Sequence, residues 1–150
     1  MLASGCAKQS PAPPVAAPDK TISLYNHQLK ISDQTLNVQV ATTSADMAEG
    51  LSDRLSMKDD EGMLFDFGQP GKPAFWMPRM HFDLDLVWIK NNKIIFITPN
   101  VPAPVGNWKL EIGNLPLYYP PSPIEQVLEV NAGWTQKNHI AVGDEVKPVQ

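Results

Sequence analysis

The sequence predicts a mainly β protein, either a compact antiparallel β-sandwich or an open barrel, with two short helices. Proline accounts for 15 of the 150 residues, about twice its ordinary share of ~5 %, and it is excluded from helix interiors and central strands. Most of the chain from residue 21 consists of short segments in which apolar and polar residues alternate, separated by turn residues. Regular alternation of strands with helices and a phosphate-binding glycine motif are both missing, which argues against a nucleotide-binding fold.

The composition narrows the class of protein further. A hydrophobic content of 43 % is too high for a wholly disordered chain. The net charge is −4 and no basic run occurs, so we expect no nucleic-acid partner. No apolar stretch approaches the ~20 residues of a membrane-spanning helix. The single cysteine, Cys6, excludes an intramolecular disulfide and a cysteine-rich zinc site.

Residues 1–20 are predicted to be an anchor and a tether, and residues 21–150 a single β-rich domain. The start, which ends in Ser4-Gly5-Cys6, resembles the cleavage box of a bacterial lipoprotein signal. The positive and apolar regions of a full export signal are missing upstream, so we expect a truncated precursor or a misassigned start. The proline-rich run over 11–18 favours a semi-rigid spacer. We therefore expect acyl chains on Cys6 to hold the protein to a membrane of the cell envelope, outside the cytoplasm.

The first predicted elements are a strand and a short helix. Thr35–Val40 alternates apolar and polar residues, as a half-buried strand does. Thr43, followed three residues later by Asp46, has the pattern of a helix start. The predicted helix covers two turns, and Gly50 is expected to end it.

Three strands are predicted next, over Gly62–Phe67, Ala74–Met77 and Leu84–Ile89, with prolines between them. Asn91 and Asn92 tolerate positive φ, so a tight hairpin is expected to connect Leu84–Ile89 to a strand over Lys93–Thr98.

The stretch from Pro99 to Pro123 contains seven prolines, with a possible strand at Trp108–Ile112. Beyond it, Gln126–Val130 is predicted to be a strand. Asn131 is expected to cap a helix near Ala132–Lys137. Gly143-Asp144 should form the turn into a last short strand.

A row of polar residues precedes the apolar segment Leu84–Ile89. If that strand runs back to His81, alternation places His81, Asp83 and Asp85 on one face. Such a row could bind a hard metal ion or supply an acid–base pair, with Arg79 contacting an anion. The alternative is a solvated face. For Asp85 a structural role is favoured, because the Val87 and Ile89 that follow suggest that its face is buried, and a buried carboxylate needs partners.

Two further groups of side chains are candidate sites. Met57, Met63, Met77 and Met80, with His81, could form a soft copper site, although methionine as core filler is the commoner outcome. The adjacent Tyr118 and Tyr119 could present flat rings to a sugar or to a proline-rich peptide of a partner. Trp108 alternates with apolar residues, so core packing is expected for it.

Several motifs together resemble the prokaryotic family catalogued as domain of unknown function 192. The resemblance covers roughly Leu36 to Val146 and is carried by these segments: Met47-x-x-Gly50-Leu51-Ser52-x-Arg54, Glu61–Phe65, Phe75-Trp76-Met77, Leu84–Trp88, Val127–Trp134 and Val142-Gly143-Asp144. It implies a jelly-roll-like sandwich, often in exported proteins, and no established activity. This chain departs from the family with Pro78 and Arg79 after the Phe-Trp-Met motif and with Asp83 where proline is usual.

The resemblance also implies roles for individual positions, most of them structural. Asn131 would be a helix cap, and Glu61 and Asp85 would be hydrogen-bonded supports for loops. Trp76 and Met77 also match positions of the family motif.

We expect a non-catalytic, lipid-anchored envelope domain, monomeric and without a cofactor, that binds a ligand or a partner. Its partners are expected to be the membrane, through acylated Cys6, and a glycan or an envelope protein. The alternative is an envelope hydrolase or metal-dependent enzyme using His81, Asp83 and Asp85. The candidate ligand-binding residues are Trp76, Arg79, His81, Asp83, Asp85, Tyr118 and Tyr119.

The anchor is testable by mass spectrometry of the native full-length protein from a membrane fraction. We expect the peptide that contains Cys6 to carry acyl chains, because a single cysteine behind small residues is what a lipoprotein signal provides. Cys6→Ala should move the protein to the membrane-free fraction. Unmodified Cys6 in a wild-type protein that is free of membrane would contradict the prediction.

Overall fold

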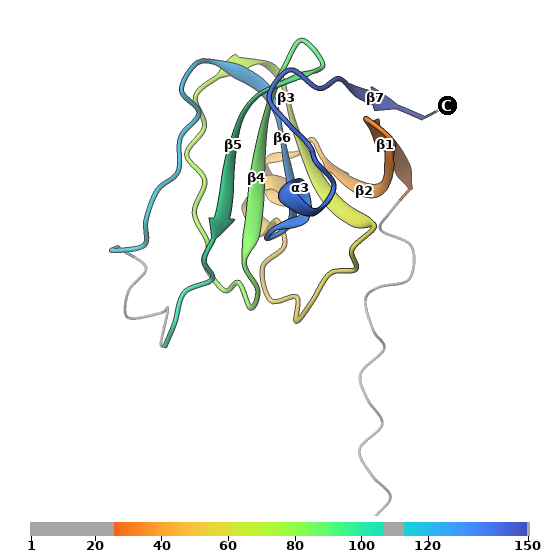
Figure 1. The fold of residues 1–150 in the computed structure, drawn as a ribbon. Coiled ribbons are helices and arrows are strands. Elements are labelled where there is room, and N and C mark those ends of the chain that lie inside the picture. Colours follow the sequence, from red (N-terminus) through yellow and green to blue (C-terminus); the bar gives the residue numbers. More distant parts are fainter. Residues whose placement is uncertain (1–25, 107–112, 150) are drawn as a thin grey trace, which may run out of the picture.

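The computed structural model describes residues 26–106 and 113–149, and its strands form one curled sheet. The elements are β1 (His27–Ile31), β2 (Gln34–Ala41), α1 (Ser44–Glu49), β3 (Glu61–Gly71), β4 (Leu84–Lys90), β5 (Lys93–Val101), β6 (Ile124–Asn131), α3 (Trp134–Lys137) and β7 (Val146–Pro148). The predicted fold class is confirmed in its open-barrel form: the sheet is a half-barrel with two short helices (Figure 1). No helix in the described part of the chain is long and apolar enough to cross a membrane.

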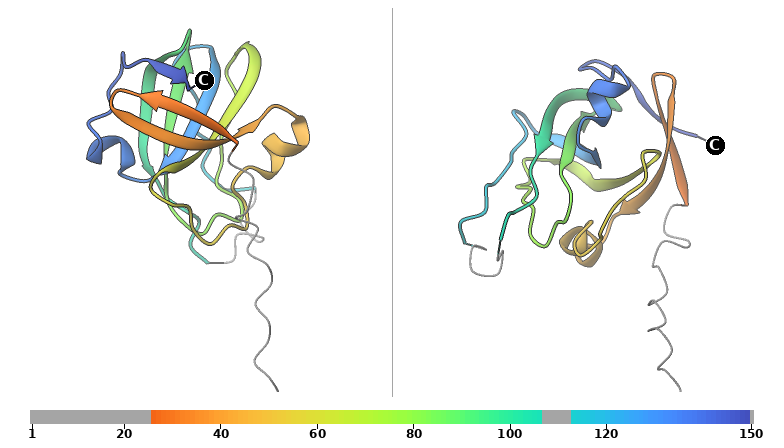
Figure 2. Two further views of the ribbon diagram at one scale, coloured as in Figure 1. Left: turned by 90° about the vertical axis from the view of Figure 1, so that its right-hand side faces the viewer. Right: turned by 60° about the horizontal axis from the view of Figure 1, so that its bottom comes forward.

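The strands follow the order β5-β4-β6-β3-β2-β1-β7. All neighbours pair antiparallel except β2 and β3, which run parallel and are joined through α1. The start of β5 also bonds the segment before β7: the Ile94 N–H donates to Asp144 O (3.0 Å), and the Gly143 N–H donates to Ile94 O (2.8 Å). These bonds draw the two ends of the sheet together. In the left view of Figure 2, β1 and β2 cross in front of β4 and β6.

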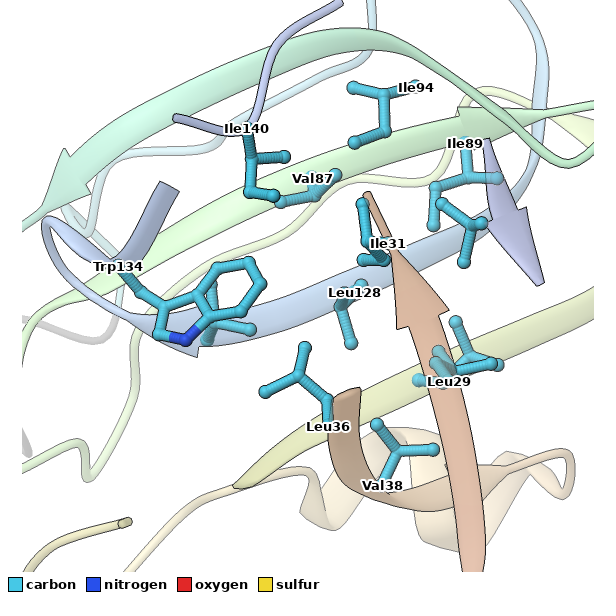
Figure 3. Packing of buried hydrophobic residues seen from close by; sticks show 13 residues of the cluster. Leu29, Ile31, Leu36, Val38, Val87, Ile89, Ile94, Leu128, Trp134 and Ile140 are labelled. Carbon is cyan, nitrogen blue, oxygen red and sulfur yellow. The ribbon is translucent and has the colours of Figure 1, made fainter. Parts of the chain in front are cut away.

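Apolar side chains inside the curl form what we call the inner core. Alternate residues of the central strands point into it, and Trp134 and Ile140 cover it from beyond β6 (Figure 3). Its buried members are Leu29, Ile31, Leu36, Val38, Leu64, Val87, Ile89, Ile94, Leu128, Val130, Trp134, Ile140 and Val146.

The opposite face of the sheet carries a second apolar cluster, the outer core. Its buried members are Ala41, Leu51, Met57, Met63, Phe65, Met77, Met80, Leu84, Leu86, Trp88, Val101, Ile124 and Val127. Leu84, Leu86 and Trp88 of β4 thus face outward, while Val87 and Ile89 face inward. Both faces of the sheet are covered, which explains why β4 is apolar almost throughout.

Local signals in the sequence predicted several elements correctly. Thr43 caps α1, its side-chain oxygen accepting the N–H of Asp46 at 3.1 Å. Asn91 and Asn92 both adopt positive φ (50° and 58°) in the hairpin between β4 and β5. The predicted strands over Thr35–Val40 and Gln126–Val130 lie within β2 and β6.

Three local predictions were wrong. Ala74–Met77 is not a strand: only Phe75 forms a bridge, with Tyr118, because Pro73 and Pro78 limit the pairing on either side. The strand β4 begins at Leu84 and does not run back to His81. Asn131 is the last residue of β6 and not a helix cap. Gly133, with φ of 78°, is the N-cap of α3 instead. The possible strand at Trp108–Ile112, like residues 1–20, lies outside the described residues.

Glu61 supports a loop, as predicted, and Asn131 supports the same loop instead of capping a helix. A carboxylate oxygen of Glu61 accepts the N–H of Lys58 at 3.1 Å. The amide of Asn131 donates to the carbonyls of Met57 (2.9 Å) and Lys58 (3.2 Å). The loop that leads into β3 is thereby fixed at the end of β6.

Asp85 is the central support of the fold. Its side chain is fully buried on the inner face of β4. One oxygen accepts the N–H groups of Asn100 (2.9 Å) and Gly133 (3.0 Å). The other accepts the N–H (3.0 Å) and the hydroxyl (2.6 Å) of Thr135. Four donors occupy the acceptor sites of one carboxylate, so the structural role that the sequence suggested for Asp85 is confirmed.

Replacing Asp85 by Asn should destabilise the domain by about 2–4 kcal/mol, because in either amide orientation at least one buried N–H then faces an NH₂ group. Urea denaturation measures the loss. Asp83→Asn is the matched control. Asp83 is exposed and accepts one N–H, from Ala103 at 2.8 Å, and Asn keeps an oxygen for it, so we expect a loss below about 1 kcal/mol. Equal losses in the two variants would contradict the role given to Asp85.

Candidate functional site

The outer face of the sheet carries a pocket of about 150 Å³. One wall is the end of α1 and the turn after it, residues 47–52. The other wall is the irregular segment 73–80, which crosses the outer core between β3 and β4. The floor comes from the sheet: Phe65 and Phe67 of β3, and Glu129 of β6. We call this site the Glu129 pocket.

Aromatic packing fixes the wall formed by residues 73–80. The ring of Phe75 meets three other rings edge to face: Phe65 at 5.1 Å, Phe67 at 6.4 Å and Trp88 at 5.5 Å between centroids. Its backbone exchanges two hydrogen bonds with Tyr118, of 2.9 and 2.8 Å. Edge-to-face contacts of this kind stabilise the packing beyond the burial of apolar area. The ring contacts thus hold the side chain of Phe75, and the hydrogen bonds hold its backbone.

The two walls are tied together at one end of the pocket. The N–H of Asp53 donates to the carbonyl of Arg79 at 2.9 Å, and Arg79 Nε donates to Asp53 Oδ2 at 3.0 Å. The hydroxyl of Ser52 reaches the carbonyl of Pro78 at 3.2 Å. Asp53 and Arg79 both adopt positive φ, of 63° and 56°. Two left-handed turns thus meet where the walls join, and their contacts offset the strain of this conformation.

Glu129 is the one carboxyl of the pocket floor. The register across the sheet aligns Gln39 of β2 with Met63 of β3, and Met63 with Glu129 of β6. Met63 belongs to the outer core, so Glu129 points to the same apolar side, where its exposed fraction is only 5 %. Burial disfavours the charged form of the carboxyl and raises its pKa to about 8.

Arg54 provides the opposing charge. Its guanidinium donates to the side-chain oxygen of Gln39, at the far end of the row that contains Glu129. The positive charge lowers the pKa of Glu129, but by less than burial raises it. Arg54 itself does not line the pocket. The arrangement therefore places a carboxyl that is largely neutral at pH 7 below an apolar cavity, with a cation on its β2 side.

A second, wider hollow of about 270 Å³ lies beside the proline-rich loops. It is lined by Tyr118 and by Met77, Pro102, Ala103, Pro104, Val105, Asn114, Leu115 and Pro116. Among the described residues its lining contains no charged side chain.

The row of His81, Asp83 and Asp85 does not meet at one point. Asp85 is buried below the turn before α3, Asp83 is exposed and bonded to Ala103, and His81 is exposed. Among the described residues no group of three His, Cys, Asp or Glu side chains could hold a metal ion. The four methionines considered for copper, Met57, Met63, Met77 and Met80, are all buried members of the outer core.

The other candidate residues lie around the walls of the two hollows. Trp76 lines the Glu129 pocket and is 44 % exposed, so it stands at the rim. Arg79 joins the walls. Tyr118 packs against the outer core, and Tyr119 is 54 % exposed. Whether any of these side chains contacts a ligand stays a prediction.

Glu129 and Arg54 were missed as site residues, although both stand in the motif segments. A signal for Glu129 was present: Val127 shares its face in the alternating strand, and an acid on an apolar face is a candidate for burial. For Arg54 there was no such signal, because only the parallel register of β2 and β3 brings Gln39 into line with Glu129.

Comparisons with known proteins agree with this architecture. The model of the family DUF192, described as an uncharacterised ACR, matches residues 27–148, and the chain belongs to this family. No curated protein matches. A candidate transcription regulator from Sinorhizobium meliloti is 26 % identical with a TM-score of 0.70, over 81 % of this chain and 92 % of that one. A protein of unknown function from Novosphingobium aromaticivorans is 24 % identical with a TM-score of 0.72, over 95 % and 99 % of the two chains, and shows the likeness of fold alone.

The raised pKa of Glu129 makes stability depend on pH. The folded domain keeps a proton to about pH 8, whereas the unfolded chain releases it near 4.5. The resulting stability is fully present below pH 4.5 and is lost as the pH rises to about 8, by up to about 1.4 kcal/mol per pH unit. Urea denaturation between pH 5 and 9 should show this slope, and Glu129→Gln, which cannot ionise, should remove it.

Glu49→Gln is the control for this measurement. Glu49 is an exposed residue at the end of α1, so its replacement should leave the difference between pH 5 and pH 8 unchanged. A slope that persists in Glu129→Gln would show that another group causes the pH dependence.

Proposed function

We propose that the domain binds a small ligand in the Glu129 pocket without transforming it, as the outward-facing part of a protein anchored in the cell envelope through Cys6. The observation that carries this proposal is a preformed apolar cavity with one buried carboxyl in its floor. Binding sites for small molecules have this composition: aromatic and aliphatic walls with few polar groups that fix the orientation of the ligand.

The construction of the pocket supports binding. Phe65, Phe75 and Trp88 are locked by mutual ring contacts, and the walls are joined through Asp53 and Arg79. A site that is already ordered loses little conformational entropy when it takes up a ligand. The volume of about 150 Å³ is comparable to that of cavities that accept a benzene-sized molecule, so the ligand or its buried group is small.

Support for the catalytic alternative is weaker. A hydrolase or metal-dependent enzyme that used His81, Asp83 and Asp85 would need these side chains to converge on a substrate. Asp85 instead accepts four hydrogen bonds from within the fold. Asp83 accepts one N–H, and His81 is exposed and does not line the pocket.

The location in the envelope is supported by the first twenty residues alone. Cys6 follows small residues, and four prolines fall within residues 11–18. A spacer of this composition would hold the domain away from the bilayer surface. The Glu129 pocket would then be open to small molecules of the periplasm or the cell exterior.

Binding can be tested with the methionine methyl groups as reporters. Met47, Met77 and Met80 line the pocket, whereas Met57 and Met63 do not. With ¹³C-methyl methionine, we expect benzene and cyclohexanol to shift the first three resonances and to leave the other two in place, because an apolar cavity of this volume takes up molecules of this size. No shift, or shifts at Met57 and Met63 alone, would contradict the proposal.

A matched pair of variants locates the binding. Ala48 and Ala45 are both exposed positions of α1, but only Ala48 lines the pocket. Ala48→Trp should abolish the shifts by filling the entrance, and Ala45→Trp should leave them unchanged.

A further inference from the structure

The charged side chains that line the Glu129 pocket are of one sign. They are Glu49, exposed at the end of α1, and Glu129 in the floor. Among the described residues no lysine, arginine or histidine lines the pocket. An entering molecule therefore meets a negative rim and a carboxyl group at the bottom, which favours a positive charge over a negative one.

The rings around the pocket favour the same charge. Phe65, Phe67, Phe75 and Trp76 all line it. The planes of Phe65 and Phe75 are at 84°, and those of Phe67 and Phe75 at 86°, so the rings of the lining differ in orientation. The faces of aromatic rings carry negative electrostatic potential, and several rings around one cavity are the usual means of recognising an ammonium group. The thioethers of Met77 and Met80 add polarisable contacts.

We propose that the ligand of the Glu129 pocket is a small organic cation, whose charged group lies among the aromatic rings with the carboxylate of Glu129 as its counter-ion. This inference rests on the proposed function and adds the chemical class of the ligand. Such a ligand meets the carboxyl from the pocket side, while Arg54 acts on it from the side of Gln39.

Uptake of a cation should be coupled to the release of a proton. The pKa of Glu129 is raised to about 8 by burial, despite the charge of Arg54. A cation inside the pocket favours the ionised carboxyl and lowers that pKa. We therefore expect the proton released near pH 7 to come from Glu129.

The charge can be separated from shape by two probes of nearly equal size. Choline carries a quaternary ammonium group, and 3,3-dimethylbutan-1-ol has a carbon in place of its nitrogen. Calorimetric titration at pH 7, with the methionine methyl shifts as a second readout, should show choline binding about tenfold more tightly or better. Titrations in two buffers of different ionisation enthalpy should report a proton released with choline and none with the alcohol.

Variants then assign the effect to one residue. Glu129→Gln should reduce the affinity for choline to that for the alcohol and leave the alcohol unaffected, which also shows that the pocket is still formed. Glu125→Gln, on the same strand but outside the pocket, should leave the preference for choline intact.

The outcomes distinguish the two proposals. If the alcohol binds as tightly as choline, or if Glu129→Gln keeps the preference, the inference about charge is overturned while the binding pocket stands. If neither probe shifts Met47, Met77 or Met80, the binding function itself is contradicted. Binding of choline alone, lost in Glu129→Gln and kept in Glu125→Gln, supports both.

Discussion

Four hydrogen bonds to one buried carboxylate, that of Asp85, hold together parts of the chain that are far apart in sequence. Asn100 lies at the end of β5, while Gly133 and Thr135 begin α3. With that turn in place, Trp134 and Ile140 cover the inner core. The chain then reaches Asp144, which bonds Ile94 and draws the ends of the sheet together. The closure of the half-barrel therefore depends on donors that converge on a single side chain, in a setting where an unpaired carboxylate would be costly.

The two faces of the sheet each bury a carboxyl, and the surroundings of these two groups distinguish a structural carboxyl from a candidate site residue. Asp85, on the inner face, is surrounded by four donors within 3.0 Å. Glu129, on the outer face, has burial as the dominant influence on its pKa, which rises to about 8. A carboxyl with a full set of donors has its role within the fold. A carboxyl that remains poorly compensated beside a cavity lowers stability at neutral pH, and such groups are concentrated at functional sites.

Much of the fold could be predicted from sequence, because its signals are local. Alternation in β2, the capping pair Thr43 and Asp46, and the Asn91-Asn92 hairpin each depend on neighbouring residues. The prediction that Asn131 caps a helix was wrong because its partners, the carbonyls of Met57 and Lys58, are more than seventy residues away. The pocket was missed for the same reason. It combines α1, the segment 73–80 and Glu129, and a single sequence does not give the register that brings them together.

The position of the pocket follows from how the chain crosses the outer face. The parallel pairing of β2 with β3 requires a crossover, which places α1 over that face. Pro73 and Pro78 keep the segment between them out of the sheet, so it also lies over the face instead of extending it.

Two covering segments that do not belong to one regular layer cannot close against each other as adjacent strands do. A cavity remains between them, and the aromatic contacts of Phe75 hold one of its walls. Since Glu129 comes from a central strand, its position is set by the rigid sheet, while the walls come from connecting segments whose side chains can vary without disturbing the ladder. A cationic ligand would therefore stabilise the domain by adding a second positive charge beside Glu129, whose burial outweighs the charge of Arg54.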